Sequence, residues 1–211
     1  MTRYAIYYMP PPGPLARFGA EWLGWDPEAG VRLSHPLSVD ALVAEPRKYG
    51  LHATLKAPFH LLGPEKDLDV AVADLARRLR PVWPGSLKLE RLGSFLALVP
   101  QGDQTALNDM ASLIVSFLEP FRRPLTEADI ARRKPDRLTP NQRALLDRWG
   151  YPFVMEEFRF HMTLTGSCDL APEAVEPMVQ PVLPSEFGID SICLVKEDQD
   201  GMFHLLRRYP I

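Results

Sequence analysis

Short runs of apolar residues, most of them ended by proline or glycine, alternate with stretches of helical periodicity along this chain of 211 residues. Runs rich in β-branched and aromatic residues predict strands, and apolar residues spaced three or four positions apart predict helices. The predicted strands are 4–9, 51–61, 87–92, 94–99, 157–165, 188–195 and 202–209. The predicted helices are 14–23, 38–44, 67–80, 103–118, 140–149 and 172–179. This mixture predicts an α+β fold built on antiparallel sheets.

Several helix boundaries are marked by capping residues. Ser38 is a candidate N-cap for the helix at 38–44, and Thr139 followed by Pro140 has the residue types that favour the start of a helix. The helix at 103–118 has the clearest apolar stripe.

Two of the predicted strands carry the same pattern, His-x-Thr-Leu, at 52–55 and 161–164. Residues i and i+2 of a strand point to the same face, so each copy presents an imidazole and a hydroxyl side by side. His52 is paired with Thr54, and His161 with Thr163. The chain has only 5 histidines, so a double occurrence by chance is improbable. Facing each other, the two strands would surround one small anion with two histidines and two hydroxyl donors.

The same alternation extends the candidate site. Lys56 should share the face of the first motif, and Arg159 and Thr165 the face of the second, provided that neither strand bulges. A lysine and an arginine there suit an anionic ligand. Tyr7 and Tyr49 could line the cleft and stack on a base or sugar, although core packing is the commoner role of such aromatics.

The surroundings of the two motifs match. Each histidine is followed by a helix, a strand, a turn glycine 41 or 40 residues on, and a closing proline 48 or 49 residues on. This predicts an internal duplication of β-α-β-β lobes, about 45–100 and 155–211, joined by a helical connection at 103–150. We expect a single bilobal domain with a pseudo-twofold axis and a central cleft between the motif strands.

Paired histidines suit phosphoryl chemistry. With pKa values near 6.5, one can be neutral and accept a proton from water while the other, protonated, donates to a leaving alkoxide. That division of labour fits an in-line displacement at phosphorus, in which Thr54 and Thr163 would donate to the non-bridging oxygens. No metal or cofactor is required. The two motifs are nearly equivalent, so the sequence leaves open which histidine is the base.

The paired motifs resemble those of the 2H phosphoesterase superfamily, which includes 2′,3′-cyclic phosphodiesterases and RNA-ligase-like proteins. The segments that carry the closer resemblance, to the branch assigned to phosphonate metabolism, are 3–7, 49–59, 135–140 and 159–166. The resemblance implies a bilobal α+β fold and metal-independent hydrolysis of a cyclic phosphodiester of ribose or a nucleotide. It also implies that His52, Thr54, His161 and Thr163 form the catalytic set.

Other interpretations stay open. The cleft could belong to a non-catalytic module that binds a phosphate ester or an RNA end, or to an enzyme that acts on polymer ends. A metal site built from His52, His60 and His161 lacks the ligand spacing that metals usually show. The basic loop at 131–137 could be a phosphate-contacting lid, but a solvated charge run is commoner.

Composition limits the partners and the compartment. The net charge of −3 gives no general attraction to extended nucleic acids or anionic membranes, and no apolar run approaches the ~20 residues that span a bilayer. With two cysteines and no signal-like N-terminus, we expect a cytoplasmic, reduced protein. The expected partner is a small, phosphorylated substrate.

Overall fold

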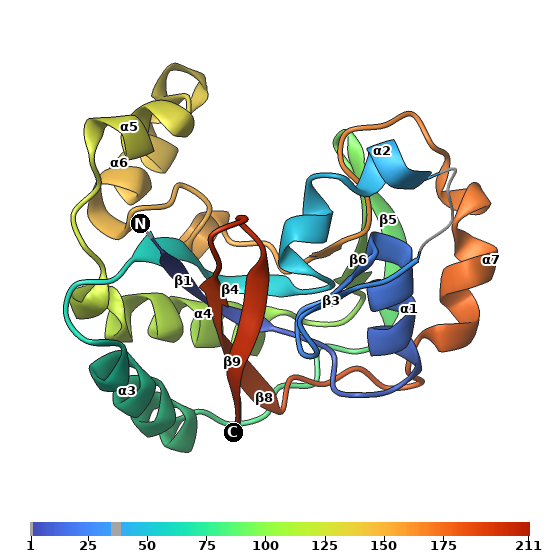
Figure 1. Ribbon diagram of the computed structural model, residues 1–211, viewed down its shortest axis with the longest axis horizontal. Coiled ribbons are helices and arrows are strands. Elements are labelled where there is room, and N and C mark those ends of the chain that lie inside the picture. Colours follow the sequence, from blue (N-terminus) through green and yellow to red (C-terminus); the bar gives the residue numbers. More distant parts are fainter. Residues whose placement is uncertain (1, 35–38) are drawn as a thin grey trace.

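A computed structural model describes residues 2–34 and 39–211 (Figure 1). The strands are β1 (Arg3–Tyr8), β2 (Trp25–Asp26), β3 (Val31–Arg32), β4 (Ala53–His60), β5 (Leu87–Leu92), β6 (Phe95–Pro100), β7 (Met162–Thr163), β8 (Ser191–Glu197) and β9 (Phe203–Pro210). The α-helices are α1 (Pro14–Leu23), α2 (Asp40–Val43), α3 (Glu65–Arg78), α4 (Thr105–Phe117), α5 (Glu127–Arg132), α6 (Pro140–Trp149) and α7 (Glu176–Val179). Short 3-10 helices include η2 (Pro46–Tyr49), η3 (Glu119–Phe121) and η5 (Met155–Glu157). Ser38, the predicted N-cap, lies outside the described residues.

The fold is α+β, as predicted. One seven-stranded sheet has the order β5-β6-β7-β4-β1-β8-β9, and every neighbouring pair in it is antiparallel. The strands β2 and β3 form a separate small ribbon. The two motif strands, β4 and β7, are therefore direct neighbours near the middle of the large sheet.

In this sheet, neither of the hairpins that follow the two motifs pairs with the motif strand that precedes it in sequence. The hairpin β5-β6 follows the first motif in sequence but pairs with β7, the strand of the second motif. The hairpin β8-β9 follows the second motif but pairs with β1, which lies beside β4. The predicted lobes 45–100 and 155–211 thus meet in one sheet. The duplication itself stays a prediction.

The main core lies on the side of the sheet where α3 and α4 pack. Ala53, Leu55 and Met162, which alternate with the motif histidines and threonines, are almost fully buried in it. A smaller apolar cluster that includes Tyr7 and Phe203 covers part of the other side. Helices α1, α2 and α7 gather at one end of the molecule and α5 and α6 at the other (Figure 1). In the described part of the chain, no helix is long and apolar enough to cross a membrane.

Two predicted elements differ from the structure. The second motif strand, expected at 157–165, is regular only at β7, since η5 occupies its start and the amides of Leu164 and Thr165 both donate to the carbonyl of Leu96. The loop predicted at 131–137 begins inside α5. This helix, which the sequence pattern did not predict, starts with a capping box between Thr126 and Asp129.

Candidate active site

The two motifs meet in a crossed arrangement. Ala53 of β4 pairs with Met162 of β7 in antiparallel register. Extending that register by one residue in each direction places His52 opposite Thr163, and Thr54 opposite His161. Directly opposite side chains have Cβ atoms about 4.5–5.5 Å apart. Each histidine therefore has the hydroxyl of its own motif along the strand and the hydroxyl of the other motif across the strands.

Both imidazoles are held in the same way. Nδ1 of His52 lies 2.9 Å from the carbonyl oxygen of Gly50, and Nδ1 of His161 lies 2.8 Å from the carbonyl oxygen of Arg159. Since a carbonyl only accepts, Nδ1 carries the proton in both rings. Nε2 of the neutral ring is then free to accept, and Thr54 Oγ1 lies 3.3 Å from Nε2 of His52. The two motifs thus have the same tautomer and expose the same ring nitrogen.

A glycine fixes the first of these carbonyls. Gly50 has φ +67°, a backbone conformation that residues with a Cβ rarely adopt, and an added Cβ would lie only 2.6 Å from Cγ of Pro27. Only glycine fits this turn without strain. The turn places the Gly50 carbonyl two residues before His52, where it accepts the Nδ1 proton.

A cavity of about 350 Å³ opens beside the motifs. His52, Thr54 and Thr163 line it, together with Thr165 and Tyr7. His161 does not line the cavity itself; it is half-buried and contacts a lining residue, with its ring centroid 5.7 Å from that of Phe95. The volume suits a phosphorylated sugar or a nucleotide.

Two tyrosines enclose the first histidine. The ring of Tyr7 lies 4.0 Å from the ring of His52, and that of Tyr49 lies 5.5 Å from it, both measured between centroids. The Tyr7 hydroxyl is buried and has no hydrogen-bond partner. A buried hydroxyl without a partner costs free energy, which a ligand oxygen in the cavity would recover.

This enclosure changes the acidity of His52. Burial disfavours the imidazolium and lowers the pKa of His52 to about 4; the Gly50 carbonyl opposes this shift, and the nearby His161 adds to it. In the free protein His52 is therefore neutral at pH 7, the form that can accept a proton.

The lowered pKa predicts a pH-dependent stability. Between about pH 4 and 6.5 the unfolded chain binds a proton at His52 that the folded chain does not, so stability is lost as the pH falls through this range. We expect the free energy of unfolding to fall by about 2–3 kcal/mol from this group. Denaturant unfolding of wild type and His52→Gln at pH 7 and pH 4.5 measures it. An equal loss in both proteins would contradict the assignment.

Three further candidates lie apart from the histidines or are engaged elsewhere. Lys56 does not line the cavity, because the pairing of β1 with β4 shifts between Thr54 and Lys56 and interrupts the alternation; its Nζ donates to Glu119. Arg159 is exposed outside β7 and contributes its carbonyl to His161. Thr165 lines the cavity, but its hydroxyl accepts the amide proton of Leu96.

Three further basic or aromatic residues line the cavity, and only one of them lies in a segment that the sequence singled out for contact with phosphate. Arg3, Arg133 and Tyr151 line it. Sequence reasoning gave neither Arg3 nor Tyr151 a role in binding; Arg3 reaches the site through the pairing of β1 with β4, and Tyr151 follows α6. Arg133 belongs to the basic loop singled out in the sequence. Among the described residues, no group of three or more His, Cys, Asp or Glu side chains is placed to hold a metal ion.

Curated relatives of this chain are longer than it is. The protein named ribose 1,5-bisphosphate phosphokinase PhnN from Janthinobacterium sp. (strain Marseille) is 34% identical over 221 residues, which cover 95% of this chain and 49% of the relative. The protein of the same name from Laribacter hongkongensis (strain HLHK9) is 34% identical over 178 residues, 79% of this chain and 40% of the relative. The chain thus spans about half or less of their length.

Two solved structures align over almost their whole length. One, described as "Crystal structure of phosphoesterase", has a TM-score of 0.47 at 16% identity and covers 100% of this chain and 99% of its own. The other, E. coli LigT complexed with 3′-AMP, has a TM-score of 0.47 at 14% identity and covers 100% and 98%. Residues 54–204 match the family described as "Protein of unknown function (DUF1045)". Since that match covers well over half of the sequence, the chain belongs to the DUF1045 family.

Proposed function

We propose that this protein is a metal-independent phosphoesterase of the 2H type that hydrolyses a cyclic phosphodiester of ribose or a nucleotide. The observation that carries the proposal is the crossed pair of motifs. Both histidines are fixed through Nδ1 to a carbonyl two residues earlier, which leaves two Nε2 atoms and two threonine hydroxyls close to one cavity. A module that only binds phosphate needs hydroxyls and cations, but it needs no pair of oriented imidazoles.

The proposed reaction uses the histidines in opposite roles. A water molecule attacks phosphorus while Nε2 of His52 takes its proton, because the enclosed ring is neutral at pH 7. The ester bond on the opposite side of phosphorus breaks, and the departing alkoxide takes the Nε2 proton of His161, which enters this step as the imidazolium with a proton on both ring nitrogens. The hydroxyls of Thr54 and Thr163 donate to the non-bridging oxygens as negative charge builds there. The product is a phosphomonoester that carries a free hydroxyl.

Support for a sugar phosphate comes from two directions. The motifs resemble a 2H branch assigned to phosphonate metabolism, and the curated relatives bear a name that refers to a phosphorylated ribose. Since the chain matches only part of those relatives, we propose a shared ligand class, not their kinase activity. A role in phosphonate catabolism follows from the same reasoning.

The test is hydrolysis in the presence of EDTA, followed by phosphorus NMR, on nucleoside 2′,3′-cyclic phosphates and ribose 1,2-cyclic phosphate. We expect the cyclic phosphate signal to convert into a monoester signal, and the preferred ring to define the substrate. Saturable binding of every compound without turnover would instead favour the binding module. Turnover that disappears in EDTA and returns with added metal would contradict metal independence.

Because the Tyr7 hydroxyl has no hydrogen-bond partner, we expect Tyr7→Phe to stabilise the fold but to weaken substrate binding. Tyr7→Phe should raise the free energy of unfolding by about 1 kcal/mol, because it removes a buried donor that nothing satisfies. The same change should raise KM about tenfold if that hydroxyl binds a substrate oxygen. Thermal unfolding and steady-state kinetics measure the two effects.

Tyr209→Phe is the matched control, since the Tyr209 hydroxyl donates to Asp69 outside the cavity. It should lose stability and leave KM unchanged. A Tyr7→Phe protein with lower stability and unchanged KM would show that Tyr7 has only a packing role.

A further inference from the structure

A second cavity adjoins the one that holds the motifs. It measures about 190 Å³, and six residues line both cavities: Arg3, Tyr49, Ala57, Pro58, Arg133 and Tyr151. Strand β4 runs from one to the other. Thr54 lies in the first cavity and Ala57 in the shared wall, three residues or about 10 Å further along the strand. A single substrate about the size of a phosphorylated pentose could reach both.

The second cavity is strongly basic. Six basic side chains line it: Arg3, Lys56, Arg122, Arg123, Arg132 and Arg133. Asp129 is the only carboxylate among the described lining residues. The charge differs sharply from that of the whole chain, which is net negative. Such a local concentration of positive charge favours an anionic ligand.

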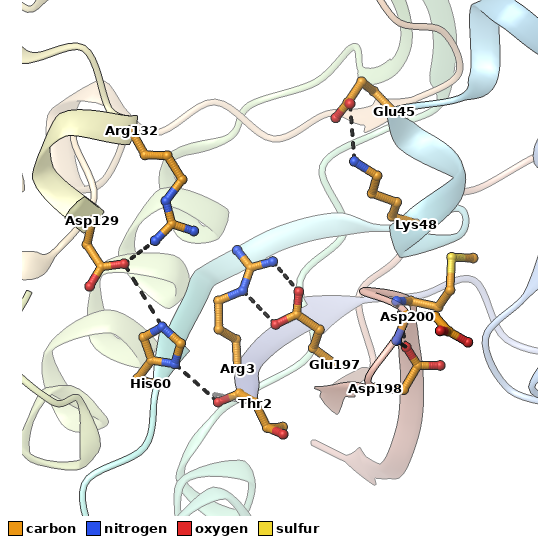
Figure 2. A network of polar contacts seen from close by, with 11 residues as sticks. Thr2, Arg3, Glu45, Lys48, His60, Asp129, Arg132, Glu197, Asp198 and Asp200 are labelled. Atoms are coloured by element: carbon orange, nitrogen blue, oxygen red, sulfur yellow. Dashed lines mark hydrogen bonds and ion pairs between the residues drawn. The ribbon is translucent and has the colours of Figure 1, made fainter. Parts of the chain in front are cut away.

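Carboxylates near the second cavity pair with several of these basic side chains. Figure 2 shows the Arg3 guanidinium paired with Glu197, and Asp129 between Arg132 and His60. Two of the six basic side chains, Arg3 and Arg132, therefore have a carboxylate partner of their own.

Glu119 is the carboxylate partner of two further basic side chains. One oxygen of Glu119 accepts from Lys56 at 3.1 Å, and the other accepts from Arg122 at 2.6 Å. Lys56 is 3% exposed and Arg122 is 11% exposed. One carboxylate thus offsets two largely buried cations and leaves a net positive charge, which is costly away from water unless an anion supplies the missing negative charge.

Arg133 lies at the boundary between the cavities. Its guanidinium lies over the ring of Tyr151, 4.8 Å from the centroid, and both residues belong to the shared wall. Stacking on an aromatic ring fixes the plane of a guanidinium and leaves its N–H donors directed outward, in the arrangement that binds phosphate through two parallel hydrogen bonds.

We propose that the second cavity binds a second phosphoryl group, a phosphomonoester carried by the same substrate whose cyclic phosphodiester lies at the histidines. This inference rests on the proposed function and narrows its substrate to a doubly phosphorylated sugar or nucleotide. The cyclic phosphate occupies the first cavity, the sugar spans the shared wall, and the monoester meets the arginines.

The experiment compares cyclic phosphates in pairs. Each nucleoside or ribose cyclic phosphate is supplied with and without a phosphate on its 5-hydroxyl, and kcat/KM is measured for wild type and for the double variant Arg132→Gln, Arg133→Gln. We expect wild type to prefer the 5-phosphorylated member at least tenfold, mainly through KM, which corresponds to about 1.4 kcal/mol. The double variant should lose most of that preference. Arg132 is exposed and Arg133 is only half-buried, so the variant should fold.

The double variant Arg77→Gln, Arg78→Gln is the matched control, because it removes two cations that pair with Asp74 on the exposed face of α3. It should keep the wild-type preference. Equal kcat/KM for both members of every pair, with turnover intact, would overturn the second phosphate site and leave the proposed function standing.

If no cyclic phosphate is hydrolysed, the proposed function fails and binding decides the second site separately. Ribose 5-phosphate is then titrated by calorimetry into wild type and the Arg132/Arg133 double variant. Saturable binding that weakens at least tenfold in the variant would support the site. No saturable binding to wild type would overturn it.

Discussion

Replacing either motif histidine by alanine should lower kcat by 10² to 10⁴-fold, the usual contribution of a positioned general acid or base. The two losses should differ in their pH dependence. In wild type, the acidic limb of kcat/KM reports the free enzyme's base, so it should lie near pH 4 and well below the ordinary histidine range. His52→Ala should abolish this limb, whereas His161→Ala should keep it in whatever activity remains.

The control is His60→Ala. His60 lies at the end of β4 and outside the cavity that holds the motifs, near Thr2 and Asp129. Its replacement should leave kcat for substrates without a second phosphate within a few-fold of wild type. A loss of kcat in His60→Ala as large as that in His52→Ala would mean that general destabilisation, not proton transfer, explains the result.

Glu119→Gln should destabilise the protein by about 3 kcal/mol, the largest stability effect we expect from a polar substitution. The substitution removes the one carboxylate that accepts from both Lys56 and Arg122, and so leaves two largely buried cations uncompensated. The glutamine keeps one acceptor oxygen in place of two and no charge, and Lys56 also keeps its hydrogen bond to the carbonyl of Val115. Chemical denaturation at neutral pH, with the midpoint and slope compared with wild type, measures the loss.

Two control variants test whether the loss of stability in Glu119→Gln comes from leaving buried cations without a carboxylate. Lys56→Met should cost much less, since it leaves Glu119 paired with Arg122 and replaces a buried cation with an apolar side chain of similar length. Glu90→Gln removes an exposed carboxylate that pairs with Lys88 and should cost less than about 1 kcal/mol. Equal losses in Glu119→Gln and Glu90→Gln would contradict the account of a net positive buried cluster.

The part of the site that sequence alone could predict is the part that depends on strand alternation. His52 with Thr54 and His161 with Thr163 needed only the two-residue period, and the core positions between them, Ala53 and Met162, are buried. Lys56 does not line the cavity of the motifs as strand alternation predicted, because the irregular pairing between β1 and β4 depends on both strands, and the sequence of one strand does not reveal it; its role in binding substrate stays a prediction.

The sequence alone could not predict the parts of the fold and the site that depend on pairing between distant strands. The exchange of hairpins between the motif strands joins residues more than 60 positions apart, as in the pairing of Ala97 with Thr163. The second cavity likewise combines Arg3 from β1 with Arg122 and Arg133 from the region after α4. The sequence showed a basic run at 131–137, but only the fold shows that its first arginines lie beside the cavity.

The most direct test of the central claim, that two histidines act together on one phosphorus, is the kcat/KM of the double variant His52→Ala, His161→Ala beside the two single variants. Residues that act as a unit have non-additive effects. We therefore predict that the double variant is no more than about tenfold slower than the slower single variant. Turnover that survives both replacements at the wild-type rate, or losses that multiply as for independent sites, would contradict the account.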